Sequence, residues 1–483
     1  MMGNAFDRMG DTIVAPATAV DRPAALAVVR LSGRSCDEVL GRVFRTGSSD
    51  LSTPRMLVLG YAHDCATGAV LDQCMAVRFP HPHSYTGEDC AELHLHGGPN
   101  VVRSVLASCV AAGARMASPG EFTRRAFLNG KLDLAQAEAV SALTSAESGL
   151  ARRAALRQLR GGLSARINSL RERLLNVAAE VECRLDFGDG EVDDLPAGQL
   201  SQWLVDIRGA MESLLSSWRR GGCFVAGGVR VALVGVPNAG KSSLFNALSG
   251  RDRAIVTAHA GTTRDSLETT LEIGGLAVTL VDTAGLRDLR ETDEIEALGI
   301  ERSCAEMSHA QLVILVLDET QMPSDVSQVE NDLRTRYDAW RASSGCAEEM
   351  PPVLCVYNKS DLLEDAERAQ LAERQGALVV SAKTLVGLDE LESTIARMVG
   401  AQETMSGDVS TTADLVTNAR HAECLSAASQ SLENAIATME STESDVLTMV
   451  DVHLAIASLN ELLGIDNPEE LLDEIFEKFC LGK

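Results

Sequence analysis

The pattern of apolar and polar positions changes character several times along the 483 residues of this chain. Residues 11–128 mix short apolar runs with turn signals. The runs at 24–33 and 75–80 predict strands, and the run at 101–113 predicts a helix. We therefore expect an α+β region at the start of the chain.

A helical pattern extends from Lys131 to about Trp218, with Leu, Ala and Val at helical spacing and charged residues on the opposite face. Its length implies more than one helix, and the adjacent glycines at 161–162 predict a break. A second helix, over 199–218, is followed by two arginines and two glycines, which form a helix stop signal.

From Val229 to about residue 400, strands and helices are expected to alternate. Short runs that are apolar throughout fit the strands of a mostly parallel sheet covered on both faces. The polar residues 401–414 predict a linker, and helical patterning returns from Leu415 to Phe479. The α/β unit is therefore predicted to be inserted into a helical domain.

Composition narrows the class of protein. The chain is 45% apolar and 23% charged, which excludes wholesale disorder and a fibrous repeat. With 43 basic and 69 acidic residues the net charge is −26, so contact with nucleic acid requires a basic patch or a basic partner. We expect no membrane span, no secretory leader and a cytoplasmic location. The twelve cysteines lack the spacing of a zinc site.

The segment GVPNAGKS, residues 235–242, follows an apolar strand and opens a helix, which is the context of a phosphate-binding loop. Its glycines let backbone N–H groups face phosphates. Lys241 offers a charge to the β and γ oxygens, and Ser242 offers its hydroxyl to Mg²⁺. The alternative is a chance match on a glycine-rich turn, against which the agreement of pattern and context argues.

Three further motifs follow in order. The motif DTAG, 282–285, ends an apolar strand, where Asp282 can hold Mg²⁺ through water and a backbone N–H can sense the γ-phosphate. In NKSD, 358–361, Asp361 can accept two hydrogen bonds from guanine that adenine cannot donate. The motif SAK, 381–383, can close over the base. Together the four motifs predict GTP rather than ATP.

The sequence indicates the groups that would assist hydrolysis less directly than it indicates the nucleotide-binding motifs. Thr263 is expected to be the second protein ligand of Mg²⁺. Leu286 follows DTAG where Ras-like GTPases carry a water-orienting glutamine, so another group must orient the water. Asn238 could coordinate a monovalent cation, and a simple turn residue is an equally good interpretation. The predicted GTP-binding residues are Asn238, Ala239, Gly240, Lys241, Ser242, Ser243, Thr263, Asp282, Thr283, Ala284, Gly285, Asn358, Lys359, Asp361, Ser381, Ala382 and Lys383, with Lys241 also catalytic.

The predicted fold class is multidomain α/β plus α. Residues 1–130 form an N-terminal α+β domain and 131–225 the first part of a helical domain. A Ras-like P-loop GTPase domain with a mostly parallel sheet occupies 226–401, and the second part of the helical domain occupies 402–483.

These motifs, together with others outside the P-loop domain, resemble the MnmE (TrmE) family of tRNA-modification GTPases. The resemblance spans nearly the whole chain, and its most specific parts are PGEFTRRAFLNGKLDLAQAEAV at 119–140 and FCLGK at 479–483. Further matches are DTIVAPAT at 11–18 and SYTGEDCAELHLHGGP at 84–99. Other GTPases of the same branch lack the two most specific parts.

The resemblance implies a K⁺ site and a water-orienting acid. Asn238 would ligate K⁺ with Thr257, the His259 carbonyl and Thr262, and Thr257 and Thr262 would also be GTP-binding residues. Glu296 would orient the water across a K⁺-dependent dimer of G domains, although it lies two residues further from DTAG than in relatives. Without the resemblance, the favoured interpretation of Glu296 is a solvated carboxylate on a helix face.

The resemblance also implies that the N-terminal domain dimerises and binds a one-carbon tetrahydrofolate, in the 5-formyl or 5,10-methylene form. Arg30, Glu92, Lys131 and Lys483 match the positions that contact folate. The basic groups can pair with a glutamyl carboxylate, and Glu92 can accept hydrogen bonds from the pterin. The alternatives are that Arg30 caps a strand and that Lys483 is frayed.

Three other features qualify this expectation. The sequence AVDRPAAL, 19–26, replaces the PPGRGG-like turn of relatives, which puts the pterin contacts in question. His94 and His96 are expected to be packing or turn residues rather than metal ligands. Cys480 matches a candidate catalytic thiol, with a packed or merely exposed thiol as the alternative.

Taken together, the resemblance implies a homodimeric GTPase that acts with an FAD-containing partner, MnmG, in a heterotetramer. The pair would add an aminomethyl or carboxymethylaminomethyl group at C5 of the wobble uridine of tRNA. The acidic chain would leave most of the tRNA contact to its partner. The alternatives are a ribosome-assembly GTPase switch of the same branch and a scaffold whose nucleotide site serves only stability.

Overall fold

The computed structural model describes residues 10–47, 51–186, 198–222, 225, 227–235, 238–250, 267–282, 303–318, 326–372, 377–399, 416–442, 445–466 and 468–483. Contacts divide the chain into two compact units. The first unit consists of Met1–Thr144, Gln158–Pro196 and Asn434–Lys483. The second consists of Ser145–Arg157 and Ala197–Glu433.

The first unit begins with a seven-stranded sheet in the order β3-β4-β5-β6-β2-β1-β7. Neighbouring strands are antiparallel except β1 and β7, which are parallel. The strands are β1 (Ile13–Pro16), β2 (Ala24–Ser32), β3 (Phe44–Arg45), β4 (Val58–His63), β5 (Val70–Phe79), β6 (Cys90–Gly97) and β7 (Arg115–Met116). The strands and the helix expected from the apolar runs are confirmed.

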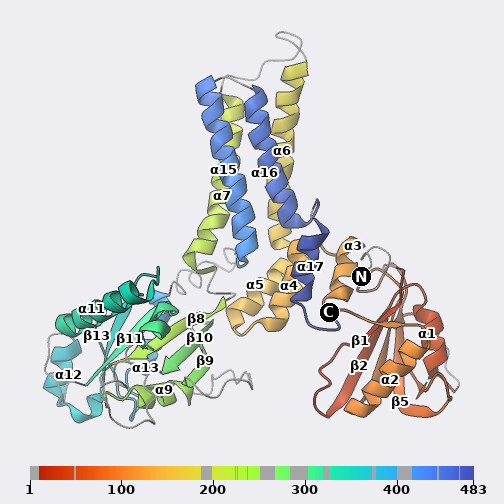
Figure 1. The fold of residues 1–483 in the computed structure, drawn as a ribbon, viewed down its shortest axis with the longest axis horizontal. Helices are drawn as coiled ribbons and strands as arrows, with labels where there is room; N and C mark the ends of the chain where they lie inside the picture. The colour runs from red at the N-terminus through yellow and green to blue at the C-terminus, as the bar shows by residue number, and fades with distance from the viewer. Residues whose placement is uncertain are drawn as a thin grey trace. The chain divides into compact units, whose positions relative to one another are not determined.

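Two helices, α1 (Cys36–Val43) and α2 (Pro99–Ala111), share one core with this sheet (Figure 1). Asp37 and Glu38 in the first turn of α1 favour its N-terminus, where unpaired N–H groups carry partial positive charge. Leu40 and Val105 are buried in that core with alternate side chains of β2 and β6. The sheet is therefore apolar on the face that the helices cover.

The rest of the first unit is helical: α3 (Glu121–Leu128), α4 (Leu134–Ser145), α6 (Gly162–Asp186), α16 (Asp445–Leu463) and α17 (Glu469–Glu477). The helix α5 (Gly149–Leu159) ends just before α6, which confirms the break predicted at the two glycines. Helices α6 and α16 run antiparallel, because Arg171 Nε donates to Asn460 Oδ1 over 2.6 Å while His453 lies 3.6 Å from Glu182.

The second unit contains a six-stranded sheet in the order β13-β12-β11-β8-β10-β9. Only β9 is antiparallel to its neighbour, so the sheet is mostly parallel as predicted. All seven residues of the central strand β11 are buried, which explains why the sequence shows unbroken apolar runs. The strands are β8 (Val229–Val234), β9 (Leu267–Ile273), β10 (Leu276–Asp282), β11 (Leu312–Asp318), β12 (Val353–Asn358) and β13 (Ala377–Val379).

Helices cover both faces of this sheet. On one face, α9 (Lys241–Ser249) and α13 (Leu388–Met398) pack against Val231 and Ile314. On the other face, α11 (Val326–Ser344) packs against Ala232 and Val313, and α12 (Asp365–Ala372) packs beside it. Successive strand residues point to opposite faces, so each strand supplies both cores.

The second unit also contains α7 (Gln199–Ser217), a π-helix η2 (Trp218–Gly222) and the part of α15 (Ala419–Thr442) up to Glu433. The Val416 amide donates to Ser217 Oγ over 3.1 Å. The chain therefore enters the P-loop segment and leaves it at neighbouring positions, as an inserted segment requires. The fold class predicted from sequence is confirmed, whereas the exact four-part domain boundaries stay a prediction.

The first turn of α5 packs against the P-loop sheet. Leu150 is buried in the core of that sheet, and its amide donates to the Gly275 carbonyl in the turn between β9 and β10. The Gly149 amide donates to Glu272 Oε1 over 3.3 Å. The sequence pattern does not indicate this contact, because helical periodicity does not say which surface the apolar face of α5 meets.

One stretch among the described residues, Val446–Leu463 in α16, is long and apolar enough to cross a membrane, with a mean hydropathy of 1.5. A single such helix is weak evidence for a span, because the core helix of a soluble protein passes the same test. Val452, Leu459 and Leu462 are fully buried, as in a helix that packs against a neighbour.

Candidate functional site

The phosphate-binding loop lies at the carboxyl end of β8, a central strand, which is where parallel α/β sheets bind ligands. Gly240 ends the loop with φ +90°, and a Cβ there would lie 2.3 Å from the Asn358 side-chain nitrogen. Only glycine fits such a position. Helix α9 begins at the next residue, so the positive end of its dipole faces the loop.

Two side chains at the start of α9 are held beside the loop. The Lys241 ammonium is largely buried and donates to the Gly235 carbonyl over 2.7 Å. Ser242 Oγ donates to Asp282 Oδ2 over 2.7 Å. The hydroxyl and the carboxylate are hard oxygen donors of the kind that Mg²⁺ prefers, so this pair fits a magnesium ion.

Asn358 connects the base motif to the phosphate loop. Its side-chain nitrogen donates to the carbonyls of Ala239 and Gly240 over 3.1 and 3.3 Å. Its side-chain oxygen accepts a bond from the Ala382 amide over 3.0 Å. Asn358 is buried, so each bond is made in a medium where an unpaired polar group is costly. The structure thus brings together three motifs that are far apart in sequence.

Asp361 lies next to these groups at the base site. Ser381 Oγ donates to Asp361 Oδ1 over 2.6 Å, and Lys383 Nζ lies 3.9 Å from the other carboxylate oxygen. The hydrogen bond from Ser381, and the nearby charge of Lys383, hold the pKa of Asp361 below its ordinary value. The carboxylate is therefore ionised at neutral pH and can accept hydrogen bonds.

Lys359 shows a contact that sequence reasoning missed. Its ammonium lies 2.6 Å from Asp318, whose side chain is fully buried at the end of β11. The signal in the sequence is an acidic residue directly after an apolar strand, the same pattern that indicates Asp282. The pair fixes the Lys359 side chain beside the phosphate loop, where Gly240 is its neighbour.

Several predicted site residues lie outside the described residues. They are Thr257, His259, Thr262, Thr263, Thr283, Ala284, Gly285 and Glu296. Asn238 is described and has φ +64°, a conformation that asparagine tolerates better than most residues. The described residues therefore include the base site and the Lys241 and Ser242 side of the phosphate site.

A second group of predicted residues lies in the N-terminal sheet. Arg30 on β2 donates from Nε to Glu92 Oε1 on β6 over 3.0 Å, and His94 Nε2 lies 3.3 Å from the other Glu92 oxygen. Lys131 Nζ donates to the Pro82 carbonyl over 3.1 Å. Among the described residues, no group of three or more His, Cys, Asp and Glu side chains is placed to hold a metal ion.

The end of the chain docks against the same domain. The Phe122 amide donates to the Lys483 carbonyl over 3.2 Å, and the Gly120 amide lies 3.5 Å from the Cys480 carbonyl. Cys480 itself is exposed. The Arg30 guanidinium carbon lies 5.9 Å from the centre of the Phe122 ring, so the docked tail and the Arg30–Glu92 pair share one neighbour.

Two family models match the chain. The model described as the GTP-binding protein TrmE N-terminus matches residues 12–131. The model described as the MnmE helical domain matches residues 134–480.

Curated relatives extend over nearly the full length. The tRNA modification GTPase MnmE of Aquifex aeolicus is 40% identical over 480 residues, 98% of this chain and 100% of the relative. That of Synechococcus elongatus is 39% identical over 482 residues, 98% of this chain and 99% of the relative. Among solved structures, Era of Aquifex aeolicus bound to GDP and AlF4⁻ is 26% identical over 35% of this chain and 56% of that chain, with a TM-score of 0.25.

The fold and the nucleotide site define a multidomain P-loop GTPase with an N-terminal α+β domain and a helical domain. Both family models and the full-length relatives agree on one assignment. The chain belongs to the MnmE family of tRNA modification GTPases.

Proposed function

We propose that GTP hydrolysis by this GTPase drives the modification of the wobble uridine of tRNA. The observation that carries the GTP part is the Asn358 side chain, which joins the base motif to the phosphate loop beside an ionised Asp361. The tRNA part rests on family membership over nearly the full chain.

In this proposal each residue of the nucleotide site has one task, whether or not it lies among the described residues. Asp361 accepts hydrogen bonds from guanine, Lys241 neutralises phosphate charge, and Ser242 ligates Mg²⁺. Thr263 is the second Mg²⁺ ligand. Asn238 ligates K⁺ with Thr257, the His259 carbonyl and Thr262, and Glu296 orients water when two G domains dimerise.

The proposed one-carbon donor is a tetrahydrofolate, held by Arg30, Glu92, Lys131 and Lys483 in the N-terminal part. Arg30 and Glu92 offer opposite charges on adjacent strands and are only about one-fifth exposed, which suits a ligand with both acidic groups and ring N–H donors. Cys480 is an exposed residue of the docked tail and is the candidate nucleophile.

The proposed assembly is a homodimer that works with an FAD-containing MnmG-type partner. A net charge of −26 supports the view that the partner supplies most of the contact with tRNA. Tight binding of tRNA by this chain alone at physiological salt contradicts that division of labour.

The deciding experiment is nucleoside mass spectrometry of bulk tRNA from cells that lack the chain. We expect aminomethyl-type wobble uridines to disappear and to return with the intact chain. Lys241→Ala should fail to restore them, whereas Arg334→Ala, in an exposed pair with Glu330 on α11, should restore them fully. An unchanged nucleoside profile contradicts the proposal and favours a ribosome-assembly switch.

The role of Glu296 has its own test. Glu296→Ala should lower the rate of GTP hydrolysis while GTP still binds with unchanged affinity. Full hydrolysis by this variant assigns Glu296 to the solvated surface instead.

A further inference from the structure

The first turns of α3 contact several segments that are far apart in the sequence. Residues 120–125 contact the segment before β1, the loop before β6 and the chain end. None of these contacts is evident from the helical pattern of α3.

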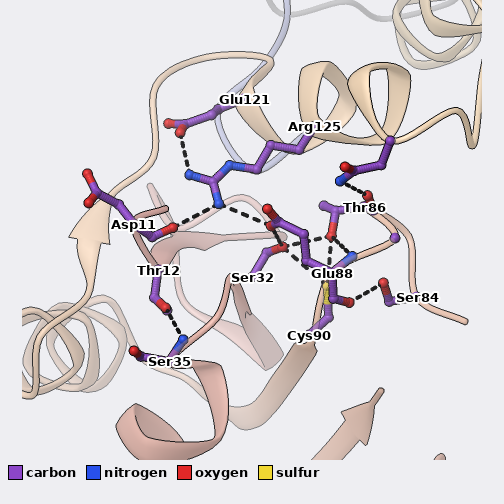
Figure 2. Close-up of polar contacts among 12 residues, drawn as sticks. Asp11, Thr12, Ser32, Ser35, Ser84, Thr86, Glu88, Cys90, Glu121 and Arg125 are labelled. Carbon is purple, nitrogen blue, oxygen red and sulfur yellow. Dashed lines mark hydrogen bonds and ion pairs between the residues drawn. The ribbon is translucent and has the colours of Figure 1, made fainter. Parts of the chain in front are cut away.

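Arg125 is the buried centre of this arrangement (Figure 2). Its side chain is only 4% exposed. Nη1 donates to the Asp11 carbonyl over 2.9 Å and to Glu88 Oε2 over 3.0 Å, and Nη2 donates to Glu121 Oε1 over 3.0 Å. A planar guanidinium can donate hydrogen bonds to three such acceptors at once, and a lysine ammonium is less suited to this geometry.

Glu88 links Arg125 to strand β2 through hydrogen bonds. Glu88 Oε2 also accepts a hydrogen bond from Ser32 Oγ over 2.7 Å, and Ser32 Oγ lies 2.7 Å from Thr86 Oγ1 (Figure 2). Ser32 and Thr86 are fully buried, so these bonds have no competition from solvent. Ser32 stands two residues after Arg30 on the same strand.

Arg30 lies close to one ring from each of the connected segments. Its guanidinium carbon is 5.4 Å from the centre of the Tyr85 ring and 5.9 Å from that of the Phe122 ring. Tyr85 belongs to the loop that Glu88 anchors, and Phe122 belongs to α3. These distances fit cation–π contacts, which depend on where each ring is held.

The two rings are coupled to each other by α3. The Tyr85 hydroxyl lies 2.9 Å from Thr123 Oγ1, directly beside Phe122 in the sequence. The Phe122 amide in turn holds the Lys483 carbonyl. Movement of α3 away from the loop would therefore change the surroundings of Arg30 and the chain end together.

We propose that Arg125 is a positioning residue of the one-carbon donor site. By joining Glu88 to Glu121 and Asp11, Arg125 fixes the spacing between the loop and α3, and so sets the position of Tyr85 and Phe122 around Arg30. The inference rests on the proposed use of a folate, whose carboxylate Arg30 would pair. Arg125 itself, being buried, does not touch the ligand.

The test is calorimetric binding of 5-formyltetrahydrofolate to the full-length protein. Arg125→Met should weaken binding at least tenfold, and Arg125→Lys should weaken it less. The control Arg103→Met, at an exposed position of α2 where Nη1 donates to Asn100 Oδ1, should bind as the wild type does. GTP affinity should be the same in all variants, because the nucleotide site lies in the other unit.

A double-mutant cycle separates positioning from mere stability. If Arg125 acts through Arg30, Arg125→Met should add little to the loss already caused by Arg30→Met. Independent, additive losses overturn the inference, as does wild-type affinity in Arg125→Met with only a lowered melting temperature. If Arg125→Met does not fold, Glu88→Gln in the same cycle decides by the same criterion.

The outcome also distinguishes the inference from the proposed function. If the wild type does not bind 5-formyltetrahydrofolate, the folate proposal fails and the positioning role falls with it. If the wild type binds and Arg125→Met binds equally, the folate proposal stands and only the inference about Arg125 is overturned.

Discussion

The side-chain nitrogen of Asn358 donates a hydrogen bond to the backbone carbonyl of Ala239 over 3.1 Å, across 119 positions of sequence. The same side chain accepts from the Ala382 amide. The phosphate loop, the base motif and the SAK motif are therefore held by one buried amide. Nucleotide affinity should depend on this amide even though its bonds stabilise protein groups.

Replacing Asn358 with alanine should weaken GTP and GDP binding to a similar degree. The change leaves buried carbonyl and amide groups without their partner, at a cost of about 1–3 kcal/mol. This corresponds to a loss of roughly 5- to 150-fold in affinity if the cost falls on the bound state. The dissociation constants of fluorescent guanine nucleotides measure it.

Asn331→Ala on the exposed side of α11 is the matched control and should leave both constants unchanged. An Asn358→Ala variant with wild-type affinities contradicts the role of this amide.

Asp361→Asn should shift the preference from guanosine to xanthosine nucleotides. Asp361 is ionised at neutral pH, since its ordinary pKa of 3.8 is already far below this pH and the Ser381 hydrogen bond lowers it further. The carboxylate only accepts hydrogen bonds, where an amide would also donate. Competition between GTP and XTP for the variant measures the shift. A variant that still prefers GTP as the wild type does removes Asp361 from base recognition.

Hydrolysis should be faster in K⁺ than in Na⁺ at equal ionic strength. Asn238 has a backbone φ of +64° in the phosphate loop, and its side chain provides an amide oxygen. A cation bound to that oxygen would neutralise charge that develops during phosphoryl transfer. The comparison is the hydrolysis rate in the two salts for the wild type and for Asn238→Ala. Equal rates in the wild type exclude the K⁺ site; an undiminished K⁺ advantage in Asn238→Ala excludes this ligand.

Gly482→Ala should abolish tRNA modification and spare GTP hydrolysis. Gly482 has φ +87°, and a Cβ there would lie 2.1 Å from the Pro16 carbonyl oxygen, so the chain end that carries Cys480 and Lys483 must move. The measurements are the tRNA nucleoside profile and the basal GTP turnover of the purified variant.

Gly113→Ala provides the control for this change. Gly113 also has a positive φ, +115°, but a Cβ there would meet nothing within 4 Å, so backbone strain occurs without a clash. If both variants support modification equally, the docked chain end is dispensable.

The Arg115–Glu121 pair should make the stability of the first unit depend on pH in the acid range. Burial alone would raise the pKa of Glu121, but hydrogen bonds from Arg115 and the Ser118 amide, with the charge of Arg125, lower it below its ordinary 4.5. The ionised carboxyl therefore contributes stability that is present above pH 4.5 and is lost as the pH falls through the lowered value.

In Glu121→Gln the melting temperature by scanning calorimetry should be lower at pH 7 and should fall less steeply below pH 4.5 than in the wild type. Glu474→Gln, in an exposed pair with Lys478, is the control. An acid profile of Glu121→Gln that parallels the wild type contradicts this contribution.

The nucleotide site could be predicted largely from the sequence because its chemistry lies in short contiguous motifs. A strand, a tight loop and a helix place Lys241 and Ser242 by local geometry, and the base motif follows its own strand. The parallel order of β8, β11 and β12 then brings the motif ends to one edge of the sheet. Asp318 was missed because its partner Lys359 is distant in the sequence.

The proposed folate-site residues of the N-terminal domain could be predicted only from the family resemblance. Arg30 and Glu92 are 62 positions apart, and nothing local indicates that antiparallel pairing of β2 with β6 places them side by side. Arg125 has the pattern of an ordinary amphipathic helix residue. Its burial among Asp11, Glu88 and Glu121 depends on three segments meeting, which periodicity does not encode.

By itself, the sequence determined the alternation of strands and helices, the phosphate loop and the preference for guanine, because each depends on residues within one or two turns of chain. Tertiary structure alone decided that Asn358 joins three motifs, that α5 packs on the P-loop sheet, and that Arg125 ties a loop to α3. The physical reason is that burial and hydrogen-bond partners are properties of the folded chain. A polar side chain is costly or stabilising only according to what surrounds it.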